Sequence, residues 1–213
     1  MDGGVEISAE AALRPEQRAA LGYARRRGSE APLEAIRSRV AGTFAEIEAL
    51  VASLGSAAAA RRPEPGRWSV HEVVDHLVES DRRGAEQLAE LVAGRAVAAH
   101  VPAGLQSADL AAIGWDELRA RFAAVHREIL ETLDRATDAT PLEATAPVEM
   151  VVRCAGDDGS SAPVHWLQRF DWKAFAILVH AHNREHIGQI RRALDAAGSV
   201  ADAARPAPGT GPE

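Results

Sequence analysis

Two histidines four residues apart, His182 and His186, lie in a stretch of the chain with the pattern of an amphipathic helix. An α-helix turns about 100° per residue, so side chains at positions i and i+4 lie on the same face, about one turn apart. Both imidazoles can therefore reach one ion, and the imidazole nitrogen is a common metal ligand. Two ligands do not make a tight site, so the decisive question is whether another part of the chain supplies a third.

His76 is the best candidate for the third ligand. It lies on the flank of the apolar stripe of an earlier helix, near the faces of Val73 and Ser80. Three neutral histidines would leave positions of a divalent ion open for water or substrate, which is typical of a catalytic site. By spacing alone, however, a histidine pair at i and i+4 is more often incidental, with each ring solvent-exposed or hydrogen-bonded locally. The residues alone leave both interpretations open.

Other residue types that could do chemistry have weaker patterns. Two acids near the histidines, Glu79 and Glu185, are candidates for a base or for orienting a ligand, although helical spacing puts Glu185 off the core face. Cys154 is the only cysteine, which excludes an internal disulfide, and we expect it to be a small packed hydrophobe. Four of the remaining histidines are expected to be solvent-facing, locally hydrogen-bonded or structural, although His165 could also face the site: His71, His100, His126 and His165. His180 falls on the other side of its helix face and is a less natural partner for the pair.

Composition limits the class of protein. The chain has 213 residues, 46% of them apolar, which suffices for one domain with a real core. Aromatic residues are only 4%, which favours packed helices over a β-sandwich. The formal net charge of -7 argues against a nucleic-acid binder. The N-terminus lacks the pattern of a secretory signal and no apolar run reaches about 18 residues, so we expect a cytoplasmic protein without a membrane partner.

Apolar periodicity predicts the elements that must position the histidines. It predicts an all-α four-helix bundle with a small β-hairpin inserted before the last helix. The helices are expected at about 33–54, 70–94, 115–138 and 172–197, with Gly198 as the stop, and the hairpin strands at 148–154 and 163–167. Residues 69–72 have the spacing of a helix capping box. We expect residues 1–30 to be an N-terminal extension, 31–198 the helical domain and 199–213 a disordered tail.

Two segments carry a resemblance to a known family. The segment RWSVHEVVDHL at 67–77, followed by Glu79, and the segment HNREHIGQI at 182–190 resemble the DinB/YfiT-like superfamily of bacterial four-helix metalloproteins, over about residues 31–197. Members place one ligand on the second helix and two on the last helix, which here implies His76, His182 and His186. The chain departs from the family pattern at Asn183, where Asp is frequent, and in carrying the hairpin.

The resemblance implies a function as well as a fold. It implies a divalent metal ion, zinc or nickel, and a homodimer. It implies a metal-dependent enzyme that acts on a small electrophilic substrate, either as an S-transferase using a low-molecular-weight thiol as co-substrate or as a hydrolase. The alternative is a non-catalytic, stress-associated or ligand-binding module with a structural metal or none.

Overall fold

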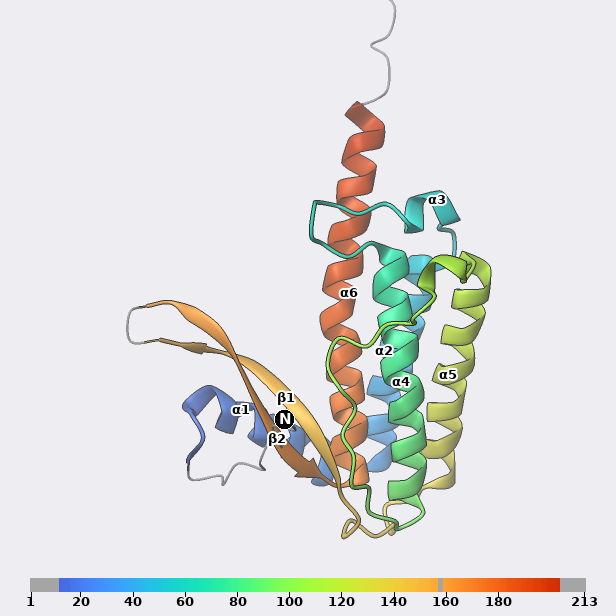
Figure 1. Ribbon diagram of the computed structural model, residues 1–213. Helices are drawn as coiled ribbons and strands as arrows, with labels where there is room; N and C mark the ends of the chain where they lie inside the picture. Colours follow the sequence, from blue (N-terminus) through green and yellow to red (C-terminus); the bar gives the residue numbers. More distant parts are fainter. Residues whose placement is uncertain (1–11, 157–158, 204–213) are drawn as a thin grey trace, which may run out of the picture.

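Four long helices lie side by side and carry most of the interior of the molecule (Figure 1). The computed structural model describes residues 12–156 and 159–203, with only the backbone for 197–203. The long helices are α2 (Leu33–Val51), α4 (Val70–Val92), α5 (Trp115–Arg135) and α6 (Trp172–Ala203). Contacts join α2 and α4 each to both α5 and α6, so that apolar stripes from all four helices face a common interior.

The helix boundaries follow from local chemistry. The predicted capping box begins α4: the Ser69 hydroxyl accepts from the Glu72 amide at 3.2 Å, and the Glu72 carboxylate accepts from the Ser69 amide at 2.8 Å. The helix ends beside Gly94, whose φ of +77° favours glycine. The prediction that α6 stops at Gly198 was wrong, because the helix continues to Ala203. Glycine only weakens a helix interior, by about 1 kcal/mol, and alanines follow it here.

Two apolar clusters fill the space between the long helices. One includes Phe44, Leu88, Ile129 and Ile177, one residue from each helix. The other includes Ile47, Val73, Leu118 and Ile190, again one from each. Because each cluster takes side chains from all four helices, the positions of α4 and α6, which carry the histidines, are fixed relative to each other.

The predicted hairpin before the last helix is confirmed. Its strands are β1 (Ala146–Ala155) and β2 (Ser161–Phe170), which pair antiparallel from Ala146 opposite Phe170 to Ala155 opposite Ser161. The hairpin projects from the side of α6 (Figure 1). None of the described helices combines the length and the apolar character needed to cross a membrane.

Residues 12–30, within the predicted extension, pack against the hairpin and α6. They form α1 (Pro15–Ala24) and a π-helical turn, η2 (Arg25–Ser29). A third apolar cluster joins Leu21 of α1 to Trp166 of β2 and Ala174 of α6. Gly28 allows this approach, because a Cβ at that position would lie 2.4 Å from the Ala174 Cα. Residues 1–11 and 204–213, which include most of the predicted tail, lie outside the described residues.

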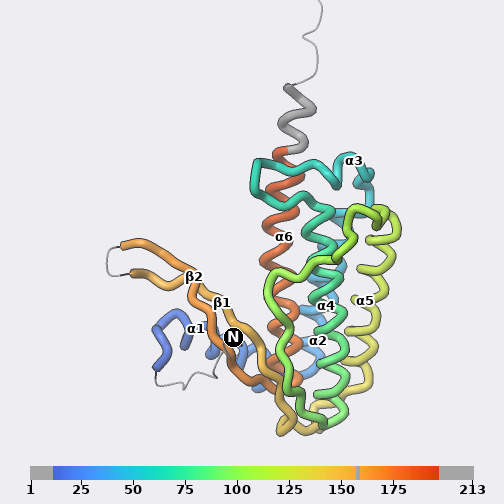
Figure 2. Tube along the Cα trace, in the orientation of Figure 1, coloured from blue at the N-terminus to red at the C-terminus, as the bar shows by residue number. Residues whose placement is uncertain are grey.

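The connection between α4 and α5 runs back along the molecule between α4 and the hairpin (Figure 2). It contains a short 3-10 helix, η3 (Leu110–Ala112). The Val97 amide donates to the Thr145 carbonyl at 3.1 Å, and the Ala103 amide donates to the Glu149 carboxylate at 3.3 Å. These bonds hold the connection over the faces of α4 and α6 that carry His76, His182 and His186. A further short helix, α3 (Ser56–Ala59), follows α2 and precedes α4 along the chain.

Candidate metal centre

The structure brings together His76, His182 and His186, the three histidines singled out from the sequence. His182 and His186 lie one turn apart on α6, and His76 faces them from α4. The His182 Nε2 atom lies 3.1 Å from the Nε2 atoms of both other rings. One ligand nitrogen from each residue can be chosen so that all three lie within 4.8 Å of one another. His76 and His186 are buried, and His182 is partly exposed.

The outer nitrogens of two rings are held by hydrogen bonds. The His76 Nδ1 lies 2.7 Å from the carbonyl oxygen of Leu105, in the connection between α4 and α5. The His186 Nδ1 lies 3.1 Å from the side-chain oxygen of Gln189. Both oxygens only accept, so Nδ1 carries the proton in each ring, and in the neutral ring Nε2 is left with a lone pair. Such outer hydrogen bonds orient the histidine ligands of metal sites.

All three rings favour the neutral form. Burial lowers the pKa of His76, while its hydrogen bond to Leu105 opposes that shift. Burial lowers the pKa of His182 to about 3, and the two neighbouring histidines add to the effect. Burial and His76 lower the pKa of His186 to about 4. Near neutral pH the rings therefore present nitrogen lone pairs rather than positive charge to the point where they meet.

The arrangement fits a divalent ion. A proton on His182 Nε2 can point at only one of its two neighbours, whereas a cation at the meeting point satisfies all three lone pairs at once. Metal–nitrogen bonds of about 2.0 to 2.1 Å place neighbouring ligand nitrogens about 2.8 to 3.4 Å apart, for angles at the metal of about 90° to 110°. The two separations of 3.1 Å lie within that range. The three residues could thus hold a metal ion.

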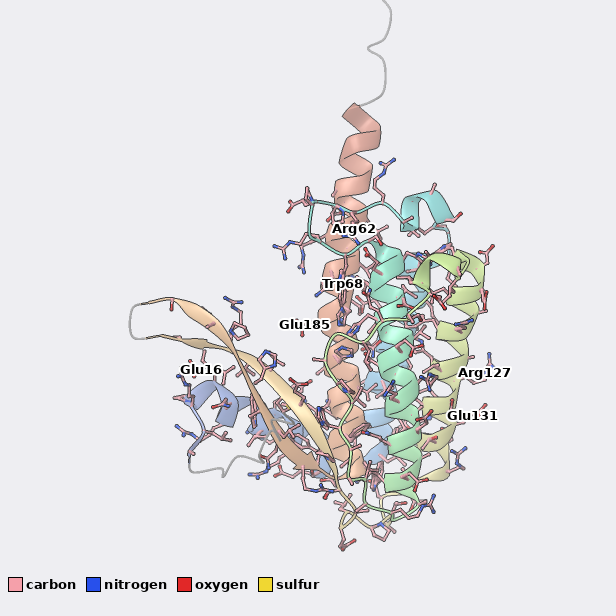
Figure 3. All side chains as sticks on the ribbon, viewed as in Figure 1. Glu16, Arg62, Trp68, Arg127, Glu131 and Glu185 are labelled. Carbon is pink, nitrogen blue, oxygen red and sulfur yellow. The ribbon has the colours of Figure 1, made fainter. Side chains whose placement is uncertain are left out.

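A cavity of about 450 Å³ opens beside the histidines. Its walls come from α4, α6, β1 and the connection at residues 101–104, and they are largely apolar, as at Val148, Met150 and Phe175. The described lining residues contribute carboxylates at Asp81, Glu149 and Glu185, but no lysine or arginine. In Figure 3, Glu185 lies on the side of α6 from which the hairpin projects. The cavity has room for a small molecule that lies against the histidines.

Trp68 packs against the histidines. Its ring centroid lies 5.1 Å from that of His76 and 6.4 Å from that of His186, with the Trp68 and His186 planes only 11° apart. Trp68 lies just before the N-cap residue Ser69 of α4. An apolar ring here limits water around two of the imidazoles, which strengthens electrostatic interactions at the site.

The other candidate residues lie elsewhere or have other partners. Glu79 pairs with Arg82 and is not among the described residues that line the cavity, whereas Glu185 is exposed at its edge. Cys154 is buried, as predicted. His165 binds Glu149 at 2.9 Å, and His71 has an edge contact with Trp115. His100 is partly exposed.

Sequence reasoning missed a group of buried polar residues behind the cavity. Asp81 is 2% exposed, borders the cavity and accepts hydrogen bonds at 3.1 and 3.0 Å from Asn183, which is fully buried. His126 lies close by and is 2% exposed, although we expected a solvent-facing or locally bonded residue. A signal was present, since Asp81 falls among apolar positions of α4 and Asn183 directly follows His182. Helical periodicity indicates which face of a helix a residue occupies, but not how deeply its side chain is buried.

Comparison with protein families matches residues 39–190, more than half of the chain, to the DinB superfamily. This range contains all three histidines and the elements that hold them. Comparisons with curated proteins and with solved structures found no match.

Proposed function

We infer that this chain, which belongs to the DinB superfamily, is a divalent-metal-dependent enzyme in which His76, His182 and His186 hold the ion. The observation that carries the proposal is the convergence of three Nε2 atoms, two of them with the opposite ring nitrogen already hydrogen-bonded. A buried cluster of imidazole lone pairs costs free energy unless a cation fills it. The four long helices would then form the four-helix bundle of the family, with the ion in its interior.

The proposed reaction is the attack of a small nucleophile on a small electrophilic substrate. A bound divalent ion, zinc or nickel, lowers the pKa of a coordinated thiol or water and so makes it nucleophilic near neutral pH. Three protein ligands leave room at such an ion for that nucleophile. The family then favours either a small-thiol S-transferase or a hydrolase for this chain.

The protein's own residues would bind and orient the substrate. The apolar walls at Val148, Met150 and Phe175 would hold its body against the histidines and exclude bulk water. Hydrogen bonds from His76 to Leu105 and from His186 to Gln189 would keep both rings in the ligand tautomer throughout. Glu185, exposed at the cavity edge, is placed to bind a substrate donor group. A homodimer stays a prediction from the resemblance.

Metal content and activity should be measured on protein purified without a histidine tag. We expect about one divalent ion per chain in the wild type, and its loss in His182→Ala. His180→Ala is the matched control, because His180 lies on the same helix but binds Thr43 at 2.7 Å. Activity is then assayed with chromogenic aryl halides plus small thiols, and with activated esters.

Metal-dependent turnover in either assay supports the enzyme. A stoichiometric ion without turnover, together with a large loss of stability on chelation, would favour the non-catalytic module with a structural metal. Metal content that is negligible in the wild type and unchanged in His182→Ala would contradict the proposal altogether.

A further inference from the structure

Three polar side chains lie in a row from the cavity to the outer surface of the helices. Asp81 of α4 borders the cavity, and His126 of α5 lies behind it with a side chain 2% exposed. Glu48 of α2 follows, with a side chain 45% exposed. Phe44 and Phe122 pack on His126 in the middle of the row, and buried polar groups in such surroundings cost free energy unless they are paired. The row therefore needs an explanation that the metal centre does not supply.

The orientation of the His126 ring is fixed by two aromatic neighbours and one hydrogen bond. Its centroid lies 3.6 Å from that of Phe44, with the planes 5° apart, and 3.9 Å from that of Phe122. Its Nδ1 lies 2.8 Å from a carboxylate oxygen of Glu48, so Nδ1 carries a proton when Glu48 is ionised. Its Nε2 is buried without a hydrogen-bond partner and lies 3.9 Å from a carboxylate oxygen of Asp81. Burial lowers the pKa of His126 to about 3, so the ring is neutral and Nε2 bears a lone pair.

Asp81 can supply the donor that this lone pair lacks. The Asn183 amide nitrogen donates toward both Asp81 oxygens and to the Val179 carbonyl, at 3.0 to 3.1 Å. Burial raises the pKa of Asp81 to about 7, and the bond from Asn183 opposes that shift. A neutral Asp81 with its proton on Oδ2 faces the His126 lone pair, whereas an ionised Asp81 would set two acceptors against each other.

The charges around the row are consistent with this arrangement. Burial raises the pKa of Glu48, and Arg127 of α5 opposes that shift. From α6, the residue in contact with Asp81 is the neutral Asn183. The row thus begins at the buried acid Asp81 and ends at the partly exposed carboxylate of Glu48, near Arg127. A proton that leaves the interior would move in this direction.

We propose that Asp81 gives and takes protons at the cavity, and that His126 carries them between Asp81 and Glu48. The Asp81 carboxyl proton passes to His126 Nε2, the ring releases its Nδ1 proton to the Glu48 carboxylate, and Glu48 passes it to water. His126 stays neutral with its proton on the other nitrogen, and Asp81 becomes a carboxylate. The 3.9 Å gap is closed by rotation of the Asp81 carboxyl group toward the ring. That a reaction in the cavity would use this proton rests on the proposed function.

Infrared spectroscopy of protein labelled with ¹³C at the aspartate carboxyl groups tests the protonation of Asp81. We expect a neutral-acid carbonyl band that fades as pH rises through about 7, and that is absent in Asp81→Asn. Asp75→Asn is the control, since Asp75 is buried on the same helix but accepts from the Ser107 amide at 2.8 Å and its hydroxyl at 2.5 Å. Loss of the band in Asp75→Asn alone, or no such band in the wild type, would overturn the proposal.

A second readout on the wild type does not depend on how the variants fold. In ¹⁵N NMR spectra recorded below about pH 7, where Asp81 holds its proton, we expect His126 with a proton on Nδ1 and none on Nε2. The opposite tautomer at that pH, or a doubly protonated ring near neutral pH, would contradict the arrangement.

The path itself is tested by following the carbonyl band after a pH jump. Glu48→Gln keeps an acceptor for His126 but cannot take up its proton, so we expect the band to relax at least about ten times more slowly. Glu46→Gln is the control, because Glu46 lies on the same helix and pairs with Arg184 and Arg191. An unchanged rate in Glu48→Gln would show that Asp81 exchanges protons through the cavity instead. None of these three measurements needs a metal, so failure of the metal centre and failure of this path are distinguishable.

Discussion

The His76 Nδ1 lies 2.7 Å from the carbonyl oxygen of Leu105, across the connection that links α4 to α5. This bond ties the tautomer of a histidine on a rigid helix to the conformation of a loop. The preceding residue, Gly104, has a φ of +67°, a conformation that side chains disfavour. The geometry of the metal centre therefore depends on residues that are not themselves ligands.

Gly104→Ala should weaken metal binding without removing a ligand. A Cβ at positive φ costs about 1 kcal/mol and shifts the loop, which moves the Leu105 carbonyl away from His76. Loss of such an orienting bond weakens metal affinity by about 10-fold or more. The measurement is a zinc titration in a competing chelator. Gly159→Ala is the control, since Gly159 has a φ of +78° in the hairpin turn, and equal affinities of the two variants would contradict this account.

Removal of the metal should lower the melting temperature. A ligand that binds only the folded state at about 100 times its Kd contributes about 2.7 kcal/mol, which corresponds to about 5 to 10 °C for a chain of this length. Thermal unfolding with and without a chelator measures the difference. His186→Ala should melt at the same temperature in both conditions, and a chelator response that survives in this variant would place the metal elsewhere.

His126 should make stability depend on pH. Its pKa is about 3 in the folded protein and about 6.5 unfolded, so the unfolded chain binds the extra proton first and stability falls as pH drops below about 6.5. The loss is about 1.4 kcal/mol per pH unit. His126→Phe keeps a ring between Phe44 and Phe122 but cannot titrate. Urea unfolding should show that the free energy of unfolding of the wild type, minus that of the variant, falls as pH drops from 6.5 to 5. A difference that stays constant over this range would argue against the neutral ring.

Gly28→Ala should destabilise the packing of α1 while leaving metal binding intact. The new Cβ would lie 2.4 Å from the Ala174 Cα, and such overpacking costs about 1 to 3 kcal/mol. Gly42→Ala on α2 is the control, because nothing lies within 4 Å of its Cβ. A helical alanine at that exposed position should stabilise the protein by about 0.5 to 1 kcal/mol. Urea unfolding and metal titration of both variants check the prediction.

The sequence was sufficient for the helices, the hairpin and the spacing of the histidines, because each has a local periodic pattern. The 3.6-residue period placed His182 and His186 on one face and made His76 the best candidate for a third ligand, and the family motif fell on the same three residues. The Leu105 carbonyl and the Asp81–His126 pair were not predictable in this way. A loop carbonyl leaves no trace in side-chain patterning, and the depth of Asp81 depends on how closely α5 packs on α4. The extent of α6 was missed because glycine is only a weak stop signal.

The most direct measurement of the central claim is anomalous X-ray diffraction from crystals of the untagged protein. The account predicts a single peak about 2.0 to 2.1 Å from the Nε2 atoms of His76, His182 and His186, at the absorption edge of zinc or nickel. The account would be contradicted by crystals of protein prepared with excess metal in which the three nitrogens lie together but no such peak lies between them.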